Sequence, residues 1–103
     1  MFLDRDKFHV SFAADLPTAQ AAFMADSQVP GGINALGGTI TEAAWRIKPS
    51  WYLVTADDRM TPPSAQRAMA ERTGATMIEA AASHSVYVSQ PNAVASLIKQ
   101  AAG

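Results

Sequence analysis

The stretch from Trp51 to His84 constrains the fold of this chain more than any other part of it. It opens with a nearly all-apolar run, residues 51–55, of the kind found in strands that are covered on both faces of a parallel sheet. A helical pattern over residues 64–72 follows, and residues 75–80 form a second strand-like run. A strand, a helix and a strand in this order predict a right-handed βαβ unit with parallel strands.

The helix within this unit is predicted to pack one face on the strands. Its apolar residues Ala65, Ala68 and Met69 are expected to face the sheet, and Gly74 is the signal that ends the helix. Three polar residues of the same helix are predicted to face outward: Gln66, Arg67 and Glu71.

Short helices are predicted before the βαβ unit, and one longer helix after it. The breaks at Pro17, at residues 29–32 and at residues 37–38 divide the first part of the chain. One short helix is predicted to end at Ala14, and three more are predicted over residues 18–28, 33–36 and 42–46. Thr41 is predicted to cap the last of them. Within residues 18–28, Phe23 forms an apolar stripe with Ala19 and Ala22. The closing helix, 92–101, is predicted to bury a stripe made of Val94, Leu97, Ile98 and Ala101.

The predicted fold class is therefore α/β. A helical segment over residues 1–48 precedes a βαβα segment over residues 49–103, and the length of 103 residues favours a single domain. Much of the apolar content is alanine, which buries little area per residue, so the core is expected to be thin.

Composition excludes several classes of function. The net charge of −1 and the lack of a long basic run argue against binding of nucleic acid. Without cysteine there are no disulfides and no thiolate metal sites, and His9 and His84 are too far apart in sequence to suggest zinc. No metal or organic cofactor is expected. No apolar run is long enough for a bilayer, and the charged N-terminus does not resemble a signal peptide, so a cytoplasmic location is expected.

Candidate catalytic residues follow the two strands. Asp57 and Asp58 come directly after the first strand, and His84 follows the second. Adjacent parallel strands lie about 4.8 Å apart, so their carboxyl-terminal loops are neighbours and an Asp–His hydrogen bond is feasible. A carboxylate that accepts the Nδ1 proton fixes the tautomer of the imidazole and leaves the other nitrogen free as a base. The alternative is a turn aspartate and an exposed loop histidine; Asp57 is expected to be such a solvated turn residue, and His9 a surface or packing residue.

The stretch from Thr55 to Pro63 resembles the triad-acid loop of the α/β-hydrolase family, which often reads Gly-x-x-Asp-x-x-x-Pro. Asp58 matches the acid and Pro62 the proline, whereas Thr55 stands where glycine is usual. Ser83-His84, followed by Gln90-Pro91, resembles the histidine loop and last helix of the family, in the same chain order.

The short helices before Trp51 are similar to the lid of esterase-like and hydroxynitrile-lyase-like members. Two glycines in residues 28–32 depart from the aromatic residue expected there. The resemblance implies that Asp58 is the triad acid and His84 the base. Phe23, Met24 and Trp45, together with Trp51, are candidates for lining an acyl pocket, the alternative being that they are core residues.

The nucleophile elbow of the family, Gly-x-Ser-x-Gly, does not occur in the chain. Ser83 and Ser85 flank His84 but do not lie on a strained elbow, so neither is expected to act as the nucleophile. The resemblance therefore implies the C-terminal portion of a hydrolase for ester or acyl substrates, with two of three catalytic residues and no activity alone. Lyase chemistry on the same triad is the alternative. Whether such a piece arises by natural truncation, gene splitting or engineering is left open.

Two further hypotheses follow from the small sheet. Two strands are too few for an independently stable sheet, and the apolar edge of residues 51–55 favours association. One hypothesis is a non-enzymatic homodimer, formed through that strand edge or through exchanged lid-like helices. The other is a split hydrolase, in which a partner chain supplies the serine.

Overall fold

The βαβ unit forms as the sequence predicts. A computed structural model describes residues 2–103 of the chain. Within them, β1 and β2 pair in parallel, with Trp51 opposite Thr76 and Thr55 opposite Ala80. The helices and strands are α1 (Arg5–Phe12), α2 (Thr18–Asp26), α3 (Ile33–Leu36), η1 (Ala44–Arg46), β1 (Trp51–Thr55), α4 (Pro63–Thr73), β2 (Thr76–Ala80), α5 (Val86–Ser89) and α6 (Pro91–Ala102).

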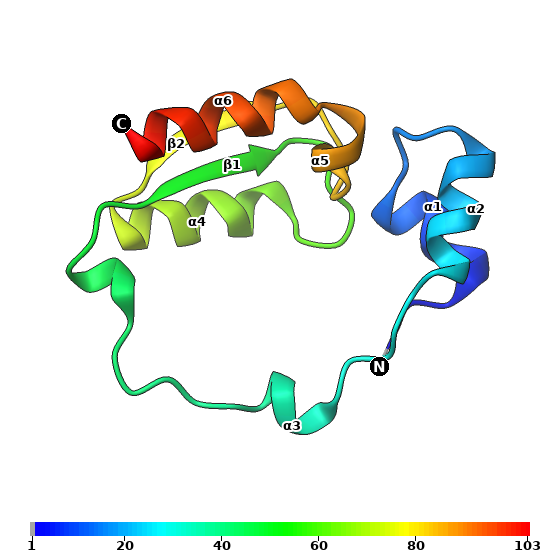
Figure 1. Ribbon diagram of the computed structural model, residues 1–103, viewed down its shortest axis with the longest axis horizontal. Helices are drawn as coiled ribbons and strands as arrows, with labels where there is room; N and C mark the ends of the chain where they lie inside the picture. The colour runs from blue at the N-terminus through cyan, green and yellow to red at the C-terminus, as the bar shows by residue number, and fades with distance from the viewer. Residues whose placement is uncertain (1) are drawn as a thin grey trace.

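Helices α4 and α6 lie on opposite sides of the sheet (Figure 1). Gly74 ends α4 in the left-handed conformation, with a φ of 66°, which suits glycine because it has no Cβ. The predicted buried stripe of α6 is only partly correct. Val94 and Leu97 are half-buried, but Ile98 is 62% exposed and Ala101 is exposed too, because a sheet of two strands is too narrow to cover the whole stripe.

The predicted orientation of α4 is wrong for Gln66 and for the three apolar residues, whereas Glu71 is exposed as predicted. Gln66, which was expected to face outward, is 2% exposed, and Ala70 is fully buried. Of the residues expected to face the sheet, Met69 is 45% exposed and Ala65 and Ala68 are exposed as well. The reason is that hydrogen bonds made by the Gln66 amide outweigh the small apolar area that an alanine buries.

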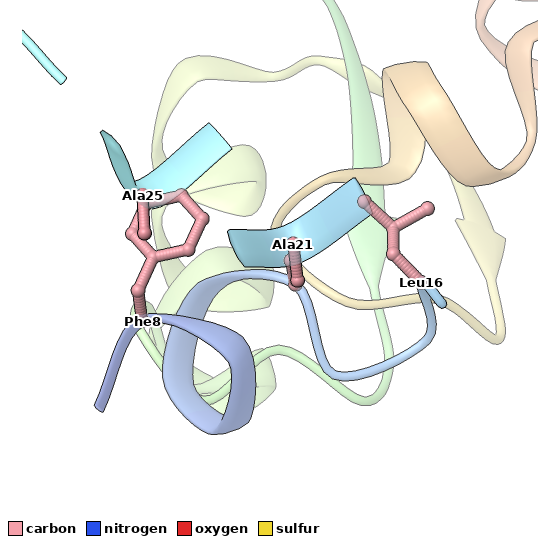
Figure 2. Close-up of a cluster of buried hydrophobic side chains, with 5 residues drawn as sticks. Phe8, Leu16, Ala21 and Ala25 are labelled. Atoms are coloured by element: carbon pink, nitrogen blue, oxygen red, sulfur yellow. The ribbon is translucent and has the colours of Figure 1, made fainter. Parts of the chain in front are cut away.

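Helices α1 and α2 pack together around a cluster of their own (Figure 2). Phe8, Leu16, Ala21 and Ala25 are all buried in it. The small alanine face of α2 allows α1 to approach closely. The stripe predicted for α2 is therefore wrong, because Ala19 and Ala22 are exposed and Phe23 is 72% exposed.

Residues 29–48, named here the connecting segment, run from the end of α2 to the start of β1 as an open arc (Figure 1). Only Ala43 and Trp45 in this segment are half-buried, and the others are exposed. The predicted helix over 42–46 is a single 3₁₀ turn, η1, preceded by Ala43 and without a side-chain cap from Thr41. The radius of gyration of 15.1 Å exceeds the roughly 13 Å of a compact domain of this length, in keeping with the open arc.

No helix within residues 2–103 combines the length and apolar character needed to cross a bilayer.

Candidate active site

Asp58 and His84 meet at the carboxyl ends of the two strands. Nδ1 of His84 lies 2.9 Å from Oδ2 of Asp58. An ionised carboxylate only accepts hydrogen bonds, so this contact places a proton on Nδ1 and makes His84 the donor. The side chain of Asp58 is 3% exposed and that of His84 is 37% exposed, so a buried acid orients a histidine that solvent can reach.

The tight turn after β1 holds the Asp58 carboxylate from its other side. Oδ1 accepts hydrogen bonds from the backbone N–H of Met60 at 2.7 Å and of Thr61 at 3.0 Å. Oδ2 accepts a third from the hydroxyl of Thr55 at 2.7 Å. The position at which the family usually has glycine thus carries a hydroxyl that serves the acid directly. These contacts fix the plane of the carboxylate independently of His84.

Gln66 of α4 completes the acid loop. Its Oε1 accepts the backbone N–H of Thr55 at 3.0 Å, and its Nε2 donates to the carbonyl of Thr61 at 2.8 Å. Nε2 also lies 3.0 Å from the Thr55 hydroxyl and 3.3 Å from Oδ2 of Asp58. No buried side-chain nitrogen or oxygen within the described residues lacks a hydrogen bond, which explains how so polar a cluster is tolerated. Sequence reasoning missed Gln66, because a polar residue on a helix is ordinarily assigned to the solvent side.

Hydrogen bonding keeps Asp58 ionised. Burial by itself raises the pKa of this carboxyl, but the hydrogen bonds donated to it outweigh burial, so the pKa of Asp58 lies below its ordinary value of 3.8. The donors, in decreasing order of effect, are the Thr61 N–H, the Thr55 hydroxyl, the Met60 N–H and His84. A carboxylate that stays charged can stabilise an imidazolium beside it.

The other nitrogen of His84, Nε2, makes no hydrogen bond to any described residue, and the ring packs on Phe12 with centroids 4.7 Å apart. His84 lines a hollow of about 270 Å³. The hollow follows β1 and reaches the Asp58–His84 pair, and its lining comprises Trp51, Tyr52, Leu53, Thr55, Asp58, Thr61, Gln66, His84 and Val86. A free base nitrogen beside a partly apolar hollow can take a proton from a nucleophile placed there.

The structure does not bring the three predicted pocket residues to this hollow. Phe23 is largely exposed, and Met24 packs against the cluster between α1 and α2. Trp45 lines a separate hollow beside α4 and lies 5.3 Å from the guanidinium of Arg46. Trp51, the fourth aromatic candidate, does line the hollow at His84. A pocket role for Phe23, Met24 and Trp45 stays a prediction about a complete enzyme.

Four other polar residues that the sequence singled out do not join the Asp58–His84 pair. Asp57 is exposed, whereas Ser83 and Ser85 are 1% and 0% exposed and make hydrogen bonds within the protein. His9 donates from Nε2 to the carbonyl of Leu16 at 2.8 Å, within the α1–α2 part of the chain. Within residues 2–103, no group of three or more His, Asp or Glu side chains is arranged to hold a metal ion.

Comparison with known families identifies the family of the chain. The model of the alpha/beta hydrolase family matches residues 1–97. The chain therefore belongs to the alpha/beta hydrolase family, and its helices and small parallel sheet are consistent with part of that fold. Searches of curated proteins and of solved structures gave no match.

Proposed function

We propose that this chain supplies the acid and the base of a serine hydrolase, and that it is inactive alone because the nucleophile lies on another polypeptide segment. The observation that carries the proposal is the 2.9 Å contact between Oδ2 of Asp58 and Nδ1 of His84, with Nε2 left unpaired beside a hollow. The lack of a Gly-x-Ser-x-Gly motif in the sequence is the reason for placing the nucleophile elsewhere.

In the complete enzyme, Nε2 of His84 takes the proton of a serine hydroxyl as that oxygen attacks an ester or related acyl carbonyl. Asp58 holds Nδ1–H and stabilises the positive charge that forms on the ring. His84 then returns the proton to the leaving alcohol. In the second half of the reaction it removes a proton from water, which releases the acid and restores the serine. Lyase chemistry on the same groups is the alternative reaction.

The purified chain tests this proposal with p-nitrophenyl acetate as substrate. Without a nucleophile, we expect only a slow reaction that rises linearly with substrate, at the level of a free imidazole. His84→Ala, compared with His9→Ala as a matched control, separates the contribution of the dyad from that of any histidine. Saturable hydrolysis that His84→Ala abolishes and His9→Ala leaves intact would show that the chain is an enzyme by itself.

The free edge of β1 supports association with another chain. Ala56 N–H donates to the carbonyl of Ala80 at 2.9 Å, and Thr76 N–H donates to the carbonyl of Ser50 at 2.8 Å. Even-numbered residues of β1 therefore turn their backbone groups towards β2, because these groups alternate between the two edges of a strand. Odd-numbered residues turn theirs away from β2.

Gln66 occupies one end of that free edge, where its amide pairs with both the N–H and the carbonyl of Thr55, at 3.0 and 3.3 Å. The backbone groups of Trp51 and Leu53 are left facing the open side, next to the hollow that leads to His84. A strand added there would satisfy them, as strand addition does in other complexes.

Two partners fit this edge, and they correspond to the two remaining hypotheses. A chain that supplies the elbow serine would complete the hydrolase, and a second copy of this chain would give a non-enzymatic homodimer, alternatively through exchange of α1 and α2. Sedimentation at micromolar concentration tests the second: a dimer that Leu53→Pro converts to monomer favours edge pairing, because proline removes the donor there. A single monomeric species in the unaltered chain would contradict the homodimer.

A further inference from the structure

The loop that carries His84 is fastened by a second carboxylate, which comes from the other half of the molecule. Asp15 lies in the turn between α1 and α2. Its Oδ2 accepts the backbone N–H of Ser83 at 3.0 Å and the hydroxyl of Ser89 at 2.7 Å. Its Oδ1 accepts the hydroxyl of Ser83. Asp15 thus binds the residue immediately before His84 and the residue that ends α5.

The same loop is held at a third point. Ser85, directly after His84, donates both its backbone N–H, at 3.1 Å, and its hydroxyl, at 2.9 Å, to the carbonyl of Phe12. The Phe12 ring also packs on the ring of His84. Ser83 and Ser85 are both buried, whereas Asp15 lies at the surface and its contact with Ser89 is exposed. The backbone at residues 83 and 85 is therefore held by the end of α1 and by the turn after it, in addition to the hydrogen bond that the Asp57 N–H of the loop after β1 donates to the Ala82 carbonyl at 3.1 Å.

We propose that Asp15 is a positioning residue for His84: by fixing the backbone at residues 83 and 89, it directs Nδ1 to Asp58 and Nε2 to the hollow. The inference rests on the proposed function of the Asp58–His84 pair. Asp15 touches neither ring nitrogen and acts only through the loop. It also makes the helical hairpin of α1 and α2 part of the catalytic apparatus, because the base is aligned only while the hairpin is in place.

The charge of Asp15 matters for this role. Burial raises the pKa of its carboxyl, but hydrogen bonds from Ser83 and Ser89 outweigh burial, so the pKa of Asp15 lies below its ordinary value of 3.8. A carboxylate can accept from all three donors at once, whereas an asparagine amide has one acceptor oxygen and no charge, so the Ser83 hydroxyl must turn round and accept from the amide N–H. Asp15→Asn therefore keeps the shape of the side chain and weakens its hold on residues 83 and 89, because hydrogen bonds to a neutral amide are weaker than those to a carboxylate.

The experiment measures the tautomer of His84 in the full chain. ¹⁵N shifts of Nδ1 and Nε2 are recorded at about pH 8.5, where an ordinary imidazole is neutral, and His84→Ala assigns the signals. Asp15→Asn is expected to shift the tautomer ratio away from Nδ1–H by about fivefold, the factor that one ordinary hydrogen bond contributes. Asp57→Asn is the matched control, since Asp57 lines the same hollow as Asp15 and its side chain makes no hydrogen bond to a described residue. It is expected to leave the ratio unchanged.

A second variant covers the possibility that Asp15→Asn does not fold. Ser89→Ala removes a single donor from Asp15, and a smaller shift in the same direction is expected. An unchanged ratio in folded Asp15→Asn, or equal shifts in Asp15→Asn and Asp57→Asn, would overturn the positioning role. Asp58→Asn separates this result from failure of the proposed function: if that variant shifts the ratio and Asp15→Asn does not, the dyad stands and only the positioning role is lost.

Discussion

The connecting segment precedes β1 and the acid loop follows it, and the two differ in how far their side chains are buried and paired. In residues 55–66, nearly every polar group near Asp58 is paired within the chain, and the Asp58 carboxylate is buried. In residues 29–48, five large aliphatic side chains are exposed: Val29, Ile33, Leu36, Ile40 and Ile47 are 62–84% exposed. The chain supplies the hydrogen-bond partners of the Asp58 carboxylate, but it leaves these five side chains uncovered.

This difference shows where the specificity of the structure resides. A buried polar cluster has one satisfactory arrangement, because any unpaired member is costly. Exposed apolar side chains do not require a particular partner, so the sequence of the connecting segment does not specify what packs against it. The experiments below test this contrast, beginning with the change that should have the largest effect.

Gln66→Leu should be the most destabilising change. Leucine has a similar volume but leaves the Thr55 N–H and the Thr61 carbonyl without a hydrogen-bond partner in a buried site. We therefore expect a loss of about 3 kcal/mol in the free energy of unfolding. Denaturant titration measures it. The same substitution at Gln100, which is exposed on α6, should cost less than about 0.5 kcal/mol. Similar costs at the two positions would mean that the acid loop is not held by this network.

Val54→Ala and Val29→Ala apply one chemical change to the two sides of the comparison. Val54 is 0% exposed in β1 and Val29 is 84% exposed in the connecting segment. We expect a loss of about 2 kcal/mol for Val54→Ala, from lost burial and a residual cavity, and almost none for Val29→Ala. If Val29→Ala proves equally costly, the connecting segment is covered in solution, by another copy or another chain, and the effect should then depend on protein concentration.

Acid should lower the free energy of unfolding by protonating the Asp58 carboxylate. Because the pKa of Asp58 is lower in the folded chain than the roughly 3.9 of an unfolded aspartate, its stabilising effect is complete above that value. It is lost as the pH falls through the folded pKa. Stability measured from pH 6 down to about pH 2 should therefore decline at the acid end, and the decline should be shallower in Asp58→Asn. An identical slope in the two proteins would show that Asp58 is not preferentially stabilised as the anion.

Arg67→Ala should have the smallest effect. The guanidinium contacts Glu79 across α4 and β2, but the two side chains are 43% and 47% exposed. Exposed ion pairs contribute about 0.5 kcal/mol or less, and added salt screens them. Denaturant titration at low and high salt checks this, and a loss above about 1.5 kcal/mol that salt does not reduce would indicate a structural role.

The sequence predicted the parts of the fold that have strong local signals. The apolar run at 51–55 and Gly74 after α4 identified the βαβ unit, and Pro17 correctly marked the start of α2. The faces of the helices were harder to predict. Alanines dominate α2 and α4, and an alanine stripe has so little area that polar contacts or close helix packing decide the orientation.

In the site, the sequence predicted the pair of Asp58 and His84 but not the residues that hold them. Asp58 and His84 lie three and four residues after their strands, so the parallel topology predicts that they share one edge of the sheet. Gln66 and Asp15 reach the site across 8 and 68 residues of sequence, from a helix face and a turn. Only the folded chain shows that their hydrogen bonds converge there, since no local pattern distinguishes them from ordinary surface residues.

The central claim is that His84 is held as a base with its proton on Nδ1, and the two histidines of the chain allow a direct test. Nδ1 of His84 faces a carboxylate, whereas Nε2 of His9 faces the Leu16 carbonyl, and both partners can only accept. ¹⁵N spectra at about pH 8.5 should therefore show opposite tautomers, Nδ1–H at His84 and Nε2–H at His9. A predominantly Nε2–H tautomer at His84, unchanged by Asp58→Asn, would contradict the claim.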